Sequence, residues 1–232
     1  MSHKKAHKDF MRVLVIAPHP DDETLGCGGT LLKHIAAGDS VSWVVVTKAY
    51  EPRWPAEDIE RRERQIEQVS AAYGFAKKFR LSFPAARLDT LPLEDLMHTF
   101  NEIVAEVKPD WIYTVHAGDV HSDHRVVFEA TTSAVKSFNS ANKGVSRLLS
   151  YETISSTDAT PPRAATVFLP NVYCDITPFL ERKLEIMSLY EGEVHPYPLP
   201  RALESIRALA RFRGATVAAE YAEAFMLLRE LR

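Results

Sequence analysis

Short apolar runs alternate with amphipathic segments along the first two thirds of the chain. Residues 13–17 and 110–116 are rich in Val, Ile and aromatic residues, a pattern typical of strands that are covered on both faces. Residues 40–49 and 77–83 indicate two further strands. The segments between the strands show the apolar spacing of helices, and proline or glycine marks several of their ends. These helices are predicted at residues 22–37, 56–74, 92–109 and 124–138.

The last third of the chain is less regular. It indicates strands at residues 147–155 and 165–176, followed by helices at residues 179–190 and 200–213. Residues 221–231 fit a strand or a helix, and we favour a strand. Alternating strands and helices are typical of a parallel sheet that is flanked by helices. We therefore predict an α/β fold with a Rossmann-like, mostly parallel sheet. Ligands of such folds bind beyond the carboxyl ends of the strands.

The composition is that of an ordinary globular protein, with 46% hydrophobic and 25% charged residues in a chain of 232. We interpret residues 12–232 as a single domain and the basic residues 1–11 as a flexible extension. A net charge of −3 gives no positive field for nucleic acid. No segment approaches the ~20 apolar residues of a transmembrane helix. Two cysteines are too few for a disulfide framework, so we expect a cytoplasmic protein.

Two polar clusters each follow a predicted strand. Residues 19–23 read HPDDE after the first strand, and residues 121–124 read HSDH after the fourth. The carboxyl ends of parallel strands meet at one edge, so both clusters should open onto the same rim. Imidazole and carboxylate groups suit zinc, and a catalytic zinc usually has three protein ligands and one open position. His19, Asp22 and His124 would supply the three ligands.

Other polar residues of these motifs could carry acid–base chemistry beside the metal. Asp21 is adjacent to a ligand and can act as general base towards a metal-activated water. His121 can stabilise an oxyanion and protonate a leaving amine, because imidazole titrates near neutral pH. Asp123 could orient an imidazole through its ring N–H. We therefore predict Asp21, His121 and Asp123 as the catalytic group.

The segment PHPDDETLGCGGTL, taken together with HSDH, resembles the PIG-L/LmbE family of zinc-dependent N-deacetylases. The resemblance implies His19, Asp22 and His124 as zinc ligands. It also implies Asp21 as the base and His121 as the acid or electrostatic partner. Later segments such as FLPNVYCDIT and EYAEAF look like the C-terminal half of LmbE-like proteins. The resemblance therefore extends over nearly the whole chain after residue 11.

Members of that family remove an acyl group, usually acetyl, from an amino sugar or its conjugate. The resemblance implies a zinc-dependent hydrolase that removes the N-acetyl group of an N-acetylglucosamine-type sugar or glycoconjugate. The same ligand set can also hold iron(II). The alternative is a zinc-dependent amidase for a non-sugar N-acyl substrate such as an antibiotic or a nucleoside. The expected partner is a small amino-sugar molecule, and a homo-oligomer stays open because family members often self-associate.

Four residues with less specific signals are candidates for substrate contact. Arg53 and Asp119 lie on predicted rim loops, and His116 ends a predicted strand at the rim. Arg62 could correspond to a substrate-binding arginine in some relatives, although a solvated helix face is the open alternative. The glycines within residues 26–29 lack the G-x-G-x-x-G fingerprint, so tight packing explains them better than dinucleotide binding.

Overall fold

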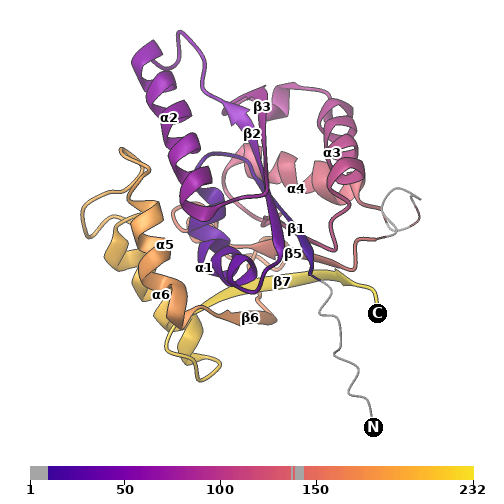
Figure 1. The fold of residues 1–232 in the computed structure, drawn as a ribbon. Helices are drawn as coiled ribbons and strands as arrows, with labels where there is room; N and C mark the ends of the chain where they lie inside the picture. The colour runs from indigo at the N-terminus through magenta and orange to yellow at the C-terminus, as the bar shows by residue number, and fades with distance from the viewer. Residues whose placement is uncertain (1–9, 137, 139–143) are drawn as a thin grey trace.

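The computed structural model describes residues 10–136, 138 and 144–232, and its centre is a seven-stranded sheet (Figure 1). The strands are β1 (Arg12–Ala17), β2 (Ser40–Lys48), β3 (Lys77–Pro84), β4 (Trp111–Val115), β5 (Arg147–Tyr151), β6 (Val172–Asp175) and β7 (Ala222–Glu230). Their order across the sheet is β3-β2-β1-β4-β5-β7-β6. The first five strands pair in parallel, whereas β7 runs antiparallel to both β5 and β6. The predicted α/β fold with a mostly parallel sheet is confirmed.

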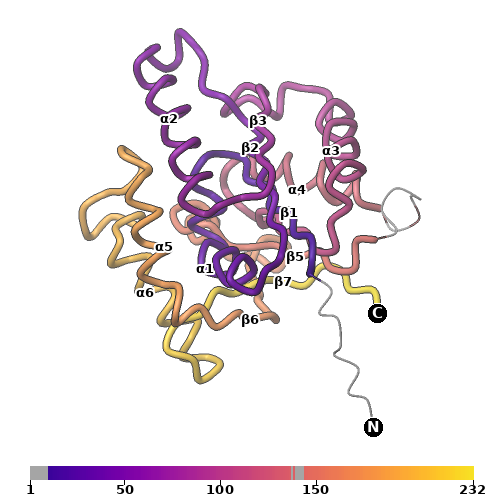
Figure 2. The backbone as a smooth tube through the Cα atoms, in the orientation of Figure 1, coloured from indigo at the N-terminus to yellow at the C-terminus, as the bar shows by residue number. Residues whose placement is uncertain are grey.

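Helices cover both faces of this sheet. In the described part of the chain they are α1 (Asp22–Ala36), α2 (Ala56–Tyr73), α3 (Leu93–Val107), α4 (Ser122–Ala134), α5 (Leu180–Met187) and α6 (Leu203–Ala215), with 3-10 helices η1 (Leu88–Thr90) and η3 (Thr177–Phe179). Helices α3 and α4 pack together on one face, and the other four gather on the opposite face (Figures 1 and 2). No helix among the described residues is long and apolar enough to span a membrane.

The central strands form the core because both of their faces are covered by helices. Residues 13–17 of β1 are all apolar and fully buried, which fixes the end of this strand as a rigid platform. Large buried side chains of other strands belong to the same core, among them Trp43 of β2, Tyr113 of β4 and Phe225 of β7. The polar turn that follows β1 is therefore held by a well-packed strand.

Close packing accounts for the glycines in α1. A Cβ atom on Gly26 would lie 2.1 Å from Cδ2 of Tyr151, and one on Gly29 would lie 2.8 Å from Ile176. Tyr151 is fully buried, and its hydroxyl donates a hydrogen bond to the carbonyl of Ile16. The start of α1 can thus approach β5 and η3 only because these positions have no side chain.

Several predicted boundaries in the last third are wrong. The strand expected at residues 165–176 is reduced to β6, because Pro170 has no N–H to donate and a turn forms around Thr166. Strand β5 ends at Tyr151 rather than at residue 155, since the next segment turns back on the carbonyl of Thr153. The final strand, β7, is confirmed.

The predicted bounds of the fourth helix are also wrong at both ends. Helix α4 begins at Ser122, two residues earlier than predicted, and ends at Ala134 rather than near residue 138. The N-cap of α4 is His121, whose side chain accepts a hydrogen bond from the N–H of Asp123. The predicted flexible extension, residues 1–11, lies outside the described residues except for Phe10 and Met11.

Candidate metal centre and active site

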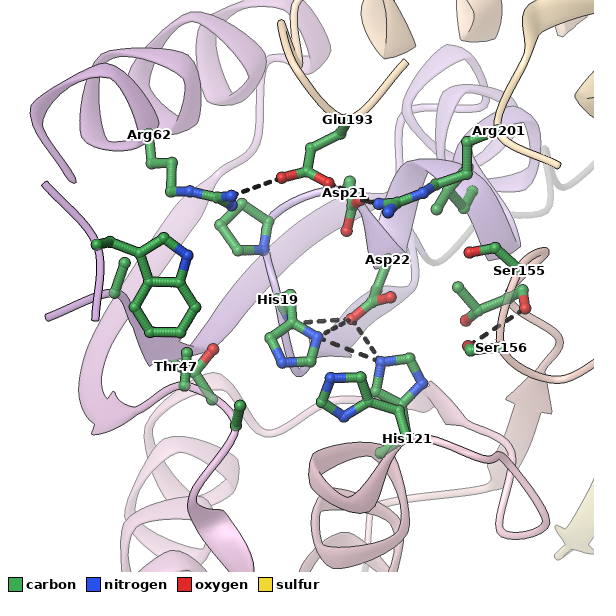
Figure 3. A pocket seen from close by; sticks show the side chains of 18 of the residues that line it. His19, Asp21, Asp22, Thr47, Arg62, His121, Ser155, Ser156, Glu193 and Arg201 are labelled. Carbon is green, nitrogen blue, oxygen red and sulfur yellow. Dashed lines mark hydrogen bonds and ion pairs between the residues drawn. The ribbon is translucent and has the colours of Figure 1, made fainter. Parts of the chain in front are cut away.

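Three potential metal ligands converge at the carboxyl ends of β1 and β4 (Figure 3). His19 follows β1, Asp22 begins α1, and His124 lies in the first turn of α4. Asp22 Oδ2 lies 3.3 Å from Nδ1 of His19 and 3.2 Å from Nε2 of His124. The two ring nitrogens are themselves 3.3 Å apart. The structure thus brings together the three residues that the sequence predicts as ligands.

A carboxylate stands behind each of the two imidazoles. His19 Nε2 lies 2.9 Å from Oδ2 of Asp123, and His124 Nδ1 lies 3.1 Å from Oδ2 of Asp119. The second contact is less well aligned, so His124 Nδ1 lacks a full hydrogen bond within the described structure. Such carboxylates fix the tautomer of a metal-binding histidine and leave its other nitrogen free to bind the ion.

Both supporting carboxylates are buried and held by further hydrogen bonds. Asp123 accepts from two backbone N–H groups, and Asp119 accepts from two hydroxyl groups. The donors are Ala86 and Leu88 for Asp123, and Ser156 and Thr157 for Asp119. The ligand histidines therefore rest on a framework that draws on three different loops.

The donor set fits a divalent metal at this position. Two imidazole nitrogens and one carboxylate oxygen suit zinc and related ions, and the candidate ligand atoms all lie within 4.8 Å of one another. A second cluster, made of His19, His121 and Asp123, is also compact. In that cluster, however, His121 Nδ1 already accepts a hydrogen bond from the Asp123 N–H, and the Asp123 carboxylate is occupied by backbone donors. The first set is therefore the better site.

The charges around this point call for a cation. Burial alone would lower the pKa of His19, but hydrogen bonds to Asp123 and Asp22 outweigh it and raise the pKa to about 9. Burial likewise opposes the protonation of His124, yet Asp22 and Asp119 raise its pKa to about 10. Asp22 stays ionised, because the histidines hold its pKa well below the usual range despite burial. A metal ion would supply the positive charge that these protons supply otherwise.

Asp21, the predicted base, lies beside the ligands in an unusual backbone conformation. Its φ is 122°, a region that costs a non-glycine residue about 1–3 kcal/mol and that is often found at functional sites. Its carbonyl accepts the N–H of Leu25 and so starts α1. Burial, with the charges of Asp22 and Glu193, raises the pKa of Asp21, and the guanidinium of Arg201 opposes this rise.

His121 lies against both ligand imidazoles. Its ring is stacked on that of His124 with centroids 4.9 Å apart, and its centroid is 4.5 Å from that of His19. Burial and the neighbouring histidines lower its pKa to about 4, so its side chain is neutral near pH 7. Because Nδ1 accepts a hydrogen bond, the proton of the neutral ring belongs on Nε2. His121 is therefore better suited to donate a hydrogen bond to an oxyanion than to act as an acid that is already positively charged before the reaction.

A cavity of about 320 Å³ opens over these side chains. This volume lies at the lower end of the range for small-molecule sites. Asp21 and His121 contribute to its lining, as does the aromatic ring of Trp54. Charged residues from α2 and the C-terminal third also line it, among them Arg62, Glu193 and Arg201. The site therefore has room for one small ligand next to the predicted base.

The four candidate substrate residues occupy different places. Arg62 lines the cavity and forms an ion pair with Glu193. Arg53 is exposed, with its guanidinium 5.0 Å from the ring centre of Trp54. His116 is buried and donates to the carbonyl of Thr166. Asp119 is buried behind His124, and neither it nor His116 contributes to the cavity wall.

Trp54, Glu193 and Arg201 are among the residues of the cavity wall that were not predicted from the sequence. Glu193 and Arg201 come from residues 188–202, the segment between α5 and α6. No local motif marks them. The only available signal is indirect: a buried carboxylate such as Asp21 requires a positive partner from elsewhere in the chain.

The fold and the site together define a Rossmann-like α/β protein with a His–Asp–His cluster at the carboxyl edge of its sheet. The model of the PIG-L family, described as GlcNAc-PI de-N-acetylase, matches residues 14–135, which is more than half of the chain. The chain belongs to the PIG-L family, as its two motifs predict.

Two curated relatives share this region. The uncharacterized deacetylase YaiS of Escherichia coli is 27% identical over 166 residues, which cover 69% of this chain and 80% of that protein. The probable N-acetyl-alpha-D-glucosaminyl L-malate deacetylase 2 of Bacillus cereus is 24% identical over 190 residues, or 78% of this chain and 83% of that protein.

Several solved structures have the same fold at low identity. N,N'-diacetylchitobiose deacetylase of Pyrococcus horikoshii gives a TM-score of 0.75 at 23% identity, with 96% of this chain and 85% of that chain covered. A zinc-inhibited form of teicoplanin deacetylase Orf2 gives 0.74 at 17% identity, covering 94% and 98%. The hydratase GalB of Pseudomonas putida gives 0.71 at 15% identity, covering 96% and 98%. The fold therefore occurs with more than one chemistry, and the site must decide the function.

Proposed function

We propose that the protein is a metal-dependent deacetylase that hydrolyses the N-acetyl group of an N-acetylglucosamine-type sugar or glycoconjugate. The observation that carries this proposal is the convergence of His19, Asp22 and His124 on one point, with Asp21 and His121 beside it on the wall of one cavity. A purely structural metal site would need neither a strained carboxylate nor an additional imidazole. The membership of the PIG-L family and the deacetylases among the relatives support the reaction class.

Zinc is the proposed metal, held by His19, Asp22 and His124. When bound, it would supply a Lewis acid for the amide carbonyl and lower the pKa of a water molecule. Because imidazole and carboxylate ligands also suit iron(II), both metals belong in the test. The zinc-inhibited form of a structural neighbour is a further reason to compare them.

The residues of the chain divide the remaining work. Asp21 takes a proton from the attacking water and passes it to the departing amine as the C–N bond breaks. His121 donates the proton on Nε2 in a hydrogen bond to the carbonyl oxygen, where negative charge develops. Asp123 and Asp119 hold the two ligand imidazoles in place. The products are acetate and a free amine.

The substrate class is proposed from the size and lining of the cavity and from the relatives. A cavity of about 320 Å³ suits a small molecule. Its wall offers Trp54 as an apolar surface, with Arg62 as a polar group that can contact hydroxyl or carboxyl oxygens. Two proteins similar to this chain act, by their names, on N-acetylglucosaminyl malate and on diacetylchitobiose.

The test is the release of acetate from a panel of N-acetyl compounds. The panel contains N-acetylglucosamine, diacetylchitobiose, an N-acetylglucosaminyl malate and a non-sugar N-acetyl amide. We expect release from at least one sugar with wild type, and only a small residual rate of release in Asp21→Asn. Asp95→Asn is the control, because Asp95 is exposed on α3, on the opposite face of the sheet from α1. Release from the non-sugar amide alone would overturn the substrate class, and full activity of Asp21→Asn would overturn the mechanism.

A further inference from the structure

Arg201 joins the proposed base to the C-terminal third of the chain. Its Nη1 atom lies 3.0 Å from Oδ2 of Asp21 and 2.6 Å from Oε2 of Glu193. The other oxygen of Glu193, Oε1, lies 2.7 Å from Nη2 of Arg62. The four side chains are therefore linked by ion pairs in the order Arg62, Glu193, Arg201, Asp21, and all four line the cavity near His19 and Asp22 (Figure 3).

We propose that Arg201 is a positioning residue, which holds Oδ2 of Asp21 so that Oδ1 is left to act on the substrate water. This inference rests on the proposed function, in which Asp21 is the general base. Among the described residues, Arg201 is the only cationic side chain in hydrogen-bond contact with the Asp21 carboxylate, and Oδ1 has no hydrogen-bond partner. One oxygen is thus fixed and the other is free on a side chain that lines the cavity.

The guanidinium of Arg201 is itself held in place. Glu193 binds it with a charge-assisted contact, and the N–H of Glu193 donates to the carbonyl of Tyr190. Helix α2 secures the same segment twice, through Arg62 on Glu193 and through Gln65, whose amide donates to the carbonyl of Glu191. Arg201 can therefore transmit a fixed geometry to Asp21, although 180 residues separate them in the sequence.

The rival role for Arg201 is direct binding of substrate. Its Nε is buried without a hydrogen-bond partner in the described structure, so a donor is left over. If Arg201 binds substrate, replacing it should mainly raise KM, and the effect should be the same whether or not Asp21 is present. If Arg201 positions Asp21, replacing it should lower kcat. The replacement should then have no effect in a protein whose residue 21 can no longer act as a base.

The experiment is a double-mutant cycle that combines Arg201→Gln with Asp21→Asn, measured as acetate release by the metal-loaded full-length protein. We expect Arg201→Gln to lower kcat by about 10- to 100-fold, the range for small misplacements of a catalytic group, with little change in KM. Arg201→Lys should recover part of the rate, because it keeps a cation within reach of Asp21. In the Asp21→Asn protein, Arg201→Gln should cause no further loss. Arg207→Gln is the matched control, since Arg207 lies six residues further along the chain, on α6, and pairs with Glu181 at the surface.

The outcomes separate this inference from the proposed function. An equal loss of kcat in both backgrounds, or a change confined to KM, would overturn the positioning role and leave the deacetylase intact. Full activity of Asp21→Asn would instead overturn the role of Asp21. A crystal structure of Arg201→Gln gives a readout that does not depend on activity. We expect the Asp21 carboxylate to leave its wild-type position, and an unmoved carboxylate would contradict the inference.

Discussion

The carboxylate behind His124 gives a sharp prediction about metal binding. In wild type, Asp119 Oδ2 faces His124 Nδ1 at 3.1 Å and favours a proton on that nitrogen, which leaves Nε2 free as a ligand. In Asp119→Asn, the amide can turn its NH2 group towards Nδ1, so the proton moves to Nε2 and blocks the lone pair. The amide oxygen then takes the place of Oδ1 and still accepts the N–H of His121, and the hydroxyl of Ser156 or Thr157 can turn to accept the second N–H of the amide, so the fold should persist.

Loss of such a supporting carboxylate typically costs about 10- to 100-fold in metal affinity. By the usual conversion this equals about 1.4–2.8 kcal/mol. The assay is a competition between the metal-free protein and a coloured zinc chelator, performed on wild type, Asp119→Asn and the exposed control Asp95→Asn. We expect the dissociation constant to rise only in Asp119→Asn. Unchanged affinity in a folded Asp119→Asn protein would refute the argument that Asp119 sets the tautomer of His124.

The remaining predictions concern stability. Lys183→Met leaves the buried Glu223 carboxylate, 2.7 Å from Lys183 Nζ, without its cation, so denaturant unfolding should show a loss of about 3–5 kcal/mol; an unchanged midpoint would contradict this. Gly26→Ala forces a Cβ against Tyr151 and should cost about 1–3 kcal/mol in the same assay, whereas a fully stable variant would exclude close packing as the reason for this glycine. Burial lowers the pKa of His34, so the unfolded chain binds more protons there. Stability that is present above about pH 6.5 should therefore fall at lower pH, and His34→Gln should flatten that slope; an equal slope in both proteins would argue against it.

The parts of the fold that the sequence predicts are those in which local pattern and packing agree. Strand β1 is a run of apolar residues and is buried on both faces. The polar motifs follow β1 and β4, so the topology of a parallel sheet was enough to bring His19, Asp22 and His124 together. For these three residues, knowing which strand each one follows was sufficient to predict that they lie close together.

The parts that the sequence does not predict depend on contacts between distant segments. Residues 165–171 look like a strand, but a turn at Thr166 places its carbonyl on the ring of His116. Arg201 and Glu193 reach the cavity from a segment without motif or regular structure. Asp119 has the character of a rim residue in the sequence, yet the structure buries it behind His124. In each of these places tertiary contacts outweigh the local pattern.

The central claim is that the cluster of His19, Asp22 and His124 holds one divalent metal that the reaction requires. The most direct measurement is a titration of metal-free protein with zinc, and separately with iron(II), while bound metal and acetate release are followed in the same sample. The account predicts that both signals saturate together at one equivalent, and that His124→Ala loses both. Full acetate release from the metal-free protein would contradict it. So would metal binding that saturates at one equivalent while the rate of acetate release does not rise.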